Sequence, residues 1–195
     1  MTPREITLDD VMDLKDYLAI RKEKRREMSA IKKDRRVEVG PFATFYFESY
    51  ATMWHQVHEM LAIEKGGAEQ APDELAAYNP LIPQGRELIA TVMFEIDDPL
   101  RRKTVLGRLG GVEETMYLEI AGERISARAE VDVDRTTADG KASSVQFVHF
   151  DFTDAQAEAF KQPGAKAIVG IDHPNYGHMA VVPEATRAAL AADLD

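Results

Sequence analysis

The stretch ELIATVMFEI, residues 87–96, decides the fold because its apolar side chains recur at every second position. A period of two places alternate side chains on the same face of a β-strand. We therefore predict a strand here, with one face packed on a hydrophobic core. The apolar residues of that face are Leu88, Ala90, Val92, Phe94 and Ile96.

Strand patterns lie on both sides of this stretch. Upstream, residues 35–48 alternate around Gly40-Pro41 and predict a hairpin. Downstream, short connections join three strands and favour an antiparallel meander. The pattern predicts an α+β fold in which an antiparallel sheet of about six strands is packed by helices on one face. The predicted downstream strands cover residues 115–120, 124–133, 144–152, 165–171 and 178–182.

Helix-start signals stand between the strands. Ser49 can cap a helix, Asp98 precedes Pro99 at a first helical position, and Thr153 forms a capping-box pattern with Gln156. A long N-terminal helix is predicted after Thr7, with Leu8, Val11, Met12, Leu14 and Leu18 as its apolar stripe. The predicted helices run over about residues 8–33, 50–65, 72–78, 99–109, 154–162 and 184–194.

Charge divides the chain into two parts. The net charge is −10, yet residues 21–36 hold nine Lys and Arg against three acidic residues, a net of +6, so the remainder carries −16. The apolar stripe fades after Ile20, which predicts that the basic half of the helix projects from the body. We expect an N-terminal helical arm over residues 1–36, basic at 21–36, and a single α+β domain over 37–195.

The basic segment has three interpretations. It is a solvated helix face, a docking surface for an acidic protein partner, or a surface that docks on the acidic body of the same protein. Nucleic acid is disfavoured because residues 21–36 contain no aromatic side chain to stack on a base and the body is acidic. The residues expected to dock a partner are Arg25, Arg26, Lys32, Lys33, Arg35 and Arg36.

Composition excludes several classes of function. The chain has no cysteine, which rules out disulfides, a nucleophilic thiol and cysteine-ligated clusters contributed by this chain. No apolar run is long enough for a bilayer, and the acidic N-terminus lacks a secretory pattern, so we expect a cytoplasmic protein with no membrane partner. We expect no cofactor, and a homo-oligomer, most simply a C₂ dimer.

The segment MWHQVHEM, residues 53–60, carries two histidines followed by a glutamate. On a helix the core-facing stripe consists of Tyr50, Met53, Trp54, Val57, Met60 and Leu61, while His55 and Glu59 lie nearly opposite. We therefore predict that His55 and His58 are solvated, and a metal is not favoured. A bound metal would need ligands from several segments, drawn from His55, His58, Glu59, His149 and His173.

The loop DHPNYGH, residues 172–178, is a second candidate site. It presents Asp172, His173 and Tyr176 to a ligand, or it is a rigid turn with Tyr176 packed on the body. His149 is predicted to be a hydrogen-bonded structural residue. No catalytic Ser-His-Asp pattern, phosphate-binding glycine loop or HExxH motif is present in the sequence.

Six segments together resemble one family of bacterial proteins: KKDRRVEVGPFATFYFE, HEMLAIE, AYNPLIP, LGRLGGVE, FVHFDF and IDHPNYGH. The family is classed only as a domain of unknown function. Its genes often neighbour those of rubrerythrin-like and iron–sulfur oxidoreductase-like proteins, which implies a link to redox or peroxide-stress systems. His55 and His58 depart from the family pattern. The resemblance adds Glu59, Tyr78, Asn79, His149, His173 and Tyr176 as candidate ligand-binding residues, beside Asp172.

Two hypotheses follow from the residues and the resemblance. The first is a non-enzymatic accessory or binding module that acts beside a redox protein and docks through the basic segment. The alternative is a small metal- or ligand-binding enzyme with a site around His149 and the loop 172–178.

Overall fold

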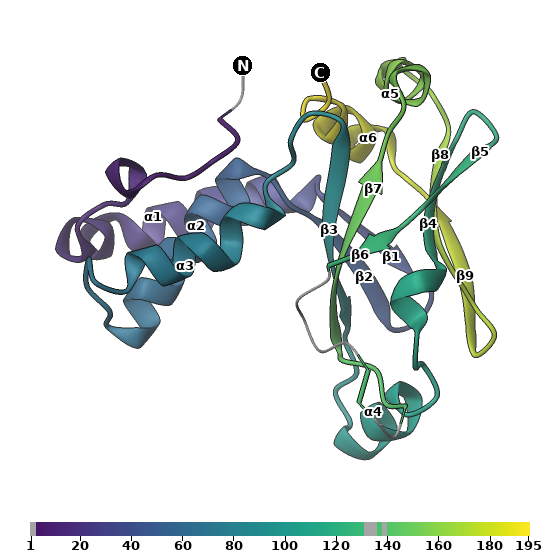
Figure 1. Cartoon of the computed structure of the whole chain (residues 1–195), viewed down its shortest axis with the longest axis horizontal. Helices are drawn as coiled ribbons and strands as arrows, with labels where there is room; N and C mark the ends of the chain where they lie inside the picture. Colours follow the sequence, from purple (N-terminus) through teal and green to yellow (C-terminus); the bar gives the residue numbers. More distant parts are fainter. Residues whose placement is uncertain (1–2, 131–135, 138–139) are drawn as a thin grey trace.

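The computed structural model describes residues 3–130, 136–137 and 140–195, and their strands form two antiparallel sheets (Figure 1). Sheet A has the order β1 (Arg36–Val39), β2 (Ala43–Phe47), β3 (Glu87–Phe94), β7 (Val145–Asp151), β6 (Arg128–Ala129). Sheet B has the order β5 (Glu123–Ser126), β4 (Met116–Ile120), β8 (Ala167–His173), β9 (Tyr176–Val181). The predicted α+β class is confirmed, but the strands are divided between two sheets.

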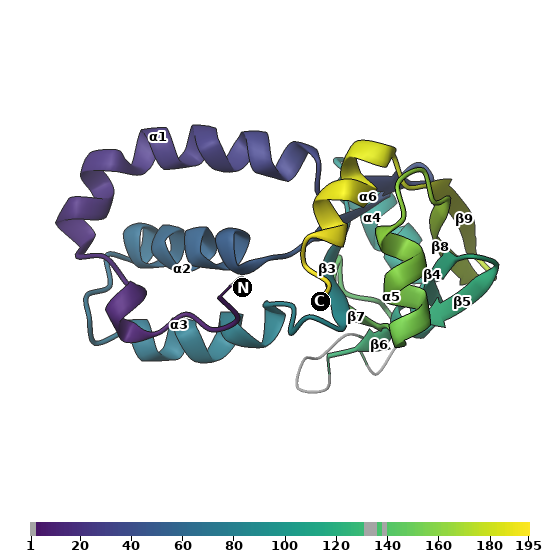
Figure 2. The same cartoon turned by 90° about the horizontal axis from the view of Figure 1, so that it is seen from above.

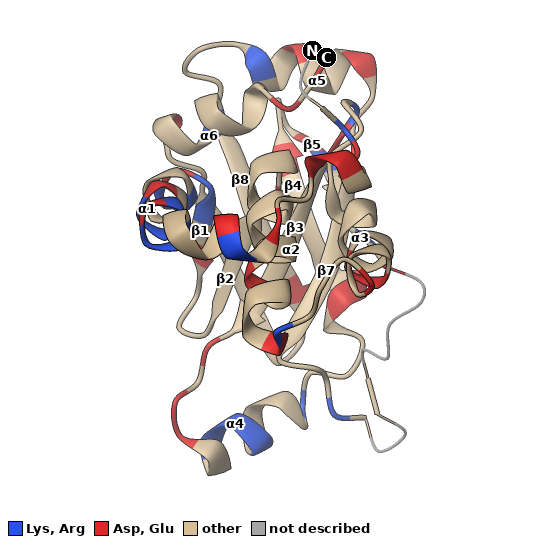
Figure 3. Ribbon diagram, turned by 90° about the vertical axis from the view of Figure 1, so that its left-hand side faces the viewer, with Lys and Arg blue, Asp and Glu red and all other residues tan. Residues whose placement is uncertain are grey.

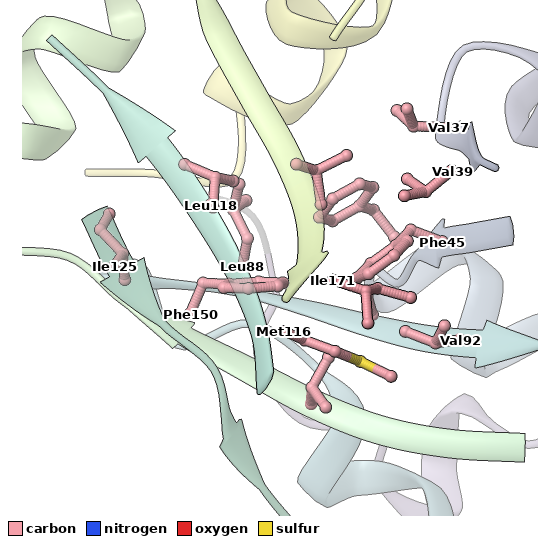
Figure 4. Close-up of a cluster of buried hydrophobic side chains, with 14 of the residues drawn as sticks. Val37, Val39, Phe45, Leu88, Val92, Met116, Leu118, Ile125, Phe150 and Ile171 are labelled. Carbon is pink, nitrogen blue, oxygen red and sulfur yellow. The ribbon is translucent and has the colours of Figure 1, made fainter. Parts of the chain in front are cut away.

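The main core lies between the two sheets (Figure 4). Leu88, Ala90 and Val92 of the central strand β3 are fully buried in it, as their spacing predicts. Phe45 of β2 and Phe150 of β7 pack beside them with ring centroids 6.4 Å apart. Burial of this apolar surface is the main driving force for assembling the two sheets.

The predicted meander is wrong at one point, because the chain changes sheet at Ala127. β5 pairs with β4 in sheet B, and β6, two residues later, pairs with β7 in sheet A. Short connections favour neighbouring strands, but they do not decide which sheet a strand joins when two sheets face each other. The C-terminal part of the expected strand 124–133, residues 131–133, lies outside the described residues.

Three helices form a layer that extends away from sheet A (Figures 1 and 2). They are α1 (Leu14–Lys33), α2 (Tyr50–Glu64) and α3 (Ala71–Tyr78). Their apolar side chains form a second core that includes Met53, Val57 and Leu61, and it reaches the outward face of sheet A at Ile89 and Phe147. The helical layer therefore stands against one face of a sheet whose other face packs on sheet B.

The remaining helices sit at the ends of the sheets (Figure 1). They are α4 (Pro99–Leu106), α5 (Asp154–Lys161) and α6 (Glu184–Ala191). The predicted caps are confirmed: the side chain of Asp98 accepts a hydrogen bond from the amide of Arg101, and Thr153 and Gln156 form a capping box. Among the described residues, no helix combines the length and the apolar character that crossing a bilayer requires.

The N-terminal helix differs from its prediction. A short 3₁₀ helix covers Leu8–Asp10, and α1 begins only at Leu14, after Asp13 caps it by accepting from the amide of Lys15. Leu8 and Leu18 of the expected stripe are exposed, whereas Tyr17 and Met28 are buried. The basic half of α1 does not project freely, because it packs along α2. The division of the chain at residue 36 remains a prediction.

Tyr176 fixes the β8–β9 hairpin to sheet A. Its hydroxyl oxygen accepts hydrogen bonds from the amides of Phe42 and Ala43, both at 2.9 Å, and its proton is donated to the carbonyl of Val39 at 2.8 Å. The side chain is buried, so the bonding capacity of the hydroxyl is used entirely within the protein. The packed turn is the interpretation of the loop 172–178 that fits this geometry.

Tyr176→Phe should lower the free energy of unfolding by about 1–3 kcal/mol, because it leaves buried backbone groups without partners. Urea unfolding followed by circular dichroism measures this change. Tyr78→Phe is the matched control, since the hydroxyl of Tyr78 has one long contact, 3.5 Å from the side-chain nitrogen of Gln56. Equal losses for the two variants would contradict the role given to the Tyr176 hydroxyl.

Candidate functional site

A cleft lies where the helical layer meets the outward face of sheet A. One wall is formed by side chains from three neighbouring strands. They point outward because successive side chains of a strand lie on opposite faces of the sheet. Tyr46, Thr91 and Phe147 are paired in one row across β2, β3 and β7. Met93 and Val145 lie side by side in the next row. The sheet therefore offers two aromatic and two aliphatic side chains to whatever enters from this side.

All three helices contribute to the opposite wall of the cleft: Lys32 comes from α1, Met53 and Gln56 from α2, and Tyr78 from α3. The cleft has a volume of about 250 Å³. Its carboxylate, Glu48, accepts hydrogen bonds from the hydroxyls of Thr52 at 2.6 Å and Thr91 at 2.7 Å. The complete lining is Lys32, Tyr46, Glu48, Met53, Gln56, Tyr78, Leu81, Thr91, Met93, Val145 and Phe147.

A basic groove of about 520 Å³ adjoins the cleft along α1. Lys32 and Tyr46 line both hollows, so the two are neighbours. In Figure 3 the ribbon of α1 is largely blue, the colour of Lys and Arg positions. The lining of the basic groove is Arg25, Met28, Ser29, Lys32, Lys33, Arg36, Tyr46 and His55.

A hydrogen-bonded network holds α1 against α2 next to the basic groove. Arg21 donates two hydrogen bonds of 2.9 Å to the carboxylate of Glu59, and the Tyr17 hydroxyl donates a third at 2.9 Å. These bonds, chiefly those from Arg21, lower the pKa of Glu59 against the opposing effect of burial. Because Tyr17 gives its proton to Glu59, its oxygen accepts from Nδ1 of His55, 3.3 Å away.

The prediction that His55 and His58 are solvated is wrong. His58 is 1% exposed: its Nε2 accepts a hydrogen bond from the amide of Met12 at 2.9 Å, and its Nδ1 donates to the carbonyl of Trp54 at 2.7 Å. Burial lowers the pKa of both histidines. Helical periodicity identified the face of α2 that packs on α3 and sheet A. The opposite flank of α2 is covered by α1, and no pattern within residues 50–64 predicts this contact.

Arg35 also differs from its prediction. It was expected to dock a partner, but its side chain is buried. The guanidinium donates to the carbonyls of Phe47 at 3.0 Å and Glu48 at 2.7 Å, and it pairs with Asp193. Arg35 therefore joins β2 to the C-terminal segment, and its burial removes it from the docking surface. Arg25, Arg26, Lys33 and Arg36 are exposed, as docking requires.

His149 lies between two carboxylates at one end of sheet A. Its Nδ1 is 2.9 Å from Glu87, and its Nε2 is 2.6 Å from Glu130. Burial lowers the pKa of His149, but the hydrogen bonds to Glu87 and Glu130 together outweigh burial and raise it. Arg128 bridges Asp151 and Glu87 beside it. The hydrogen bonding predicted for His149 is confirmed, and its structural role stays a prediction.

This raised pKa predicts a pH-dependent contribution to stability. A histidine whose pKa is higher in the folded state stabilises fully below its unfolded pKa, about 6.5, and the contribution is lost as pH rises through the folded value. Wild type should therefore exceed His149→Gln in stability by more at pH 6 than at pH 8. Urea unfolding of both proteins at the two pH values measures the difference. A difference that grows toward pH 8 would contradict the assignment.

The structure does not unite the remaining candidates in one site. Asn79 exchanges two hydrogen bonds with the backbone of Ile6, and Asp172 pairs with Arg124 on sheet B. His173 is 3.3 Å from the carbonyl of Gly110. Tyr78 alone among the predicted ligand-binding residues lines the cleft. No group of three or more His, Asp and Glu in the described part of the chain has the arrangement of a metal site.

The sequence carried one signal for the cleft that the prediction did not use. Met93, Val145 and Phe147 are apolar residues on the face of sheet A that a one-sided sheet would leave polar. Apolar residues on both faces of a strand indicate a layer on each side.

A larger hollow of about 730 Å³ is lined by Arg102, Lys103 and Lys141, but it adjoins residues 138–139, which the structure does not describe.

Comparison with known protein families matches residues 5–194 to the family described as "Protein of unknown function (DUF3501)". The chain belongs to this family. A crystal structure of a novel protein of unknown function from Burkholderia pseudomallei K96243 has the same fold, with a TM-score of 0.91, 35% sequence identity and 100% of each chain covered. No curated protein matches the chain. The predicted resemblance to a family of unknown function is thereby confirmed.

Proposed function

We propose that the chain is a non-enzymatic binding module that docks an acidic partner protein through the exposed basic residues of α1 and of the start of β1. The observation that carries this proposal is a set of cations without acidic partners. In the described part of the chain, Lys33 and Arg36 have no ion pair, and Arg25 has only a contact of 4.0 Å with Glu59. The protein as a whole has 34 acidic residues against 24 basic ones, so the local excess of positive charge is pronounced.

The titratable groups near the cleft favour binding over catalysis. Glu48 accepts hydrogen bonds from two threonines, and Glu59 is held by Arg21 and Tyr17. A general base needs a free acceptor within reach of a substrate proton. Both carboxylates are instead engaged in contacts that hold elements of the protein together. His149 likewise has both ring nitrogens engaged, by Glu87 and Glu130. These contacts support an accessory role rather than the alternative of an enzyme around His149.

The family resemblance suggests the class of partner. The gene neighbourhood it implies contains rubrerythrin-like and iron–sulfur oxidoreductase-like proteins, and a chain without cysteine can serve a cluster protein only as a partner. Attraction between complementary charges speeds association, and added salt weakens this attraction by screening it. We therefore propose a redox protein with an acidic surface as the partner of α1.

The test is calorimetric titration of the protein with purified rubrerythrin-like and iron–sulfur oxidoreductase-like proteins of the same organism. Binding should weaken by about tenfold or more between low and physiological salt, as charge screening predicts. It should be lost in the variant Arg25→Gln, Arg26→Gln, Lys33→Gln, Arg36→Gln. The melting temperature of that variant should change by only a few degrees, since exposed substitutions usually cost under about 0.5 kcal/mol.

A matched control removes the same charge elsewhere. Lys65, Lys103, Arg108 and Lys166 are exposed, and they lie outside α1 and outside both hollows. Their fourfold Gln variant should bind like wild type. Equal loss in both variants would mean that net charge, not the α1 surface, drives binding. Absence of binding by either redox protein would overturn the proposed partner.

A further inference from the structure

We propose that the cleft and the basic groove together form a site for a small organic phosphate. The phosphate group lies in the basic groove, and a flat ring of the same molecule lies in the cleft. This goes beyond partner docking, because it concerns a small ligand held in the two hollows, although Arg25, Lys33 and Arg36 belong both to the docking surface and to the lining of the basic groove. Lys32 and Tyr46, which line both hollows, stand where the two parts of the ligand join.

The donors of the basic groove suit a doubly charged anion. Lys32, Lys33 and Arg36 line it and have no ion pair among the described residues, and the hydroxyl of Ser29 lies beside them. Arginine and lysine donors form their strongest hydrogen bonds with ionised acceptors such as phosphate oxygens. A phosphate monoester offers up to two negative charges and three acceptor oxygens, which matches a cluster of several cations better than a single carboxylate does.

The lining of the cleft suits a flat apolar group. Tyr46 and Phe147 lie in one row of the sheet wall, with Met93 and Val145 in the next, and Tyr78 contributes a third aromatic ring from α3. Ligand sites are commonly hollows of about 300–1,000 Å³ with mainly apolar walls and a few polar groups. The basic groove alone falls within that range, and the cleft extends it.

Charge also fixes the direction of the ligand. Glu48 lines the cleft, whereas Arg25, Lys33 and Arg36 line only the basic groove. A phosphate placed in the cleft would meet a carboxylate. One placed in the groove meets cations. The uncharged part of the ligand is therefore the part that occupies the cleft.

His55 links phosphate binding to proton uptake. It lines the basic groove, and its Nδ1 donates to Tyr17, which leaves Nε2 as an acceptor with no hydrogen bond from the described residues. The charged groups that act on His55 are Glu59 and His58 of α2 and Arg25 and Lys32 of α1. An anion beside Arg25 and Lys32 offsets their repulsion of a proton on His55. Bound phosphate should therefore raise the pKa of this histidine.

In the experiment, the full chain is titrated separately with phenyl phosphate, inorganic phosphate and benzoate. Calorimetry measures the affinity of each probe, and the imidazole signals in NMR report the titration of His55. Phenyl phosphate should bind about tenfold more tightly than either of the others, since it alone fills both hollows. It should shift the titration of His55 to higher pH. Equal affinities for the three probes, or an unshifted His55, overturn the proposal. Weak binding of inorganic phosphate alone means an adventitious ion only, and it also overturns the proposal.

Three variants assign the binding to these hollows. Lys32→Gln should weaken both phosphate probes by about tenfold, the value of one charge-assisted contact. Met93→Trp, at an exposed position of the cleft wall, should weaken phenyl phosphate but not inorganic phosphate. Lys103→Gln, outside both hollows, should change neither. Arg26 is the docking residue that lies outside both hollows, so Arg26→Gln should weaken partner docking and leave phenyl phosphate binding unchanged, which tells failure of docking from failure of this site. If Lys32→Gln and Met93→Trp both bind phenyl phosphate as tightly as wild type does, the ligand binds elsewhere and the proposal is wrong.

Discussion

Arg35→Ala should lower the free energy of unfolding by about 3–5 kcal/mol, the usual cost of removing one partner from a buried charged pair. The change leaves the carbonyls of Phe47 and Glu48 without their donor and the carboxylate of Asp193 without its counter-charge. Asp193 is itself largely buried, and burial raises its pKa although Arg35 opposes the rise. The loss is therefore dominated by unpaired buried groups rather than by lost packing.

Urea unfolding of Arg35→Ala and Arg36→Ala provides a matched comparison. Arg36 is the next residue along the chain and is exposed, so its substitution should cost under about 0.5 kcal/mol. A carboxyl with a raised folded pKa stabilises below its unfolded pKa and loses that contribution as pH rises. Without Arg35 the pKa of Asp193 should rise further, so the deficit of Arg35→Ala should be smaller at pH 5 than at pH 8. A loss as small as that of Arg36→Ala would show that Arg35 is not structural.

His58→Ala should cost about 2–5 kcal/mol, the range for truncating a large buried side chain. The imidazole packs on Trp54 with ring centroids 3.9 Å apart and on Tyr17 at 4.8 Å. Its two hydrogen bonds also fix the connection before α1, because Nε2 accepts from the amide of Met12. Truncation thus opens a cavity between α1 and α2 and leaves a backbone donor unpaired.

The pH dependence of His58 should be opposite to that of His149. Burial lowers the pKa of His58, and a histidine with a lowered folded pKa stabilises fully above its unfolded value and loses that contribution as pH falls through the folded one. The cost of His58→Ala should therefore be greater at pH 7.5 than at pH 5. His178→Ala, at an exposed position on β9, is the control and should cost under about 0.5 kcal/mol. Similar costs for the two variants would contradict the burial of His58.

Local signals predicted most of the elements. The period-two pattern of residues 87–96, the cap at Ser49 and the capping box at Thr153 each depend on residues a few positions apart, and the structure confirms all three. What failed depended on contacts between distant segments. The cover that α1 places over His55 comes from distant residues, as in the contact of Tyr17 with His55, which are separated by 38 positions.

The candidate site was still harder to predict, because no single segment contains it. Lys32, Gln56, Tyr78 and Phe147 come from three helices and a strand and meet only after the helical layer has packed on sheet A. The sequence did identify Tyr78 and Lys32, but for different reasons and as parts of different sites. Their convergence depends on the angle between layers, which hydrophobic periodicity does not encode.

Because the chain changes sheet at Ala127, we expect the two sheets to unfold together. One continuous segment, residues 123–129, is hydrogen-bonded to β4 at its start and to β7 at its end. Separating the sheets would pull this segment from one side or the other, and it would also expose the core between them. Sheet A, which carries the cleft, therefore cannot loosen on its own. A ligand that stiffens the cleft should transmit its stabilising effect to sheet B, although it makes no contact there.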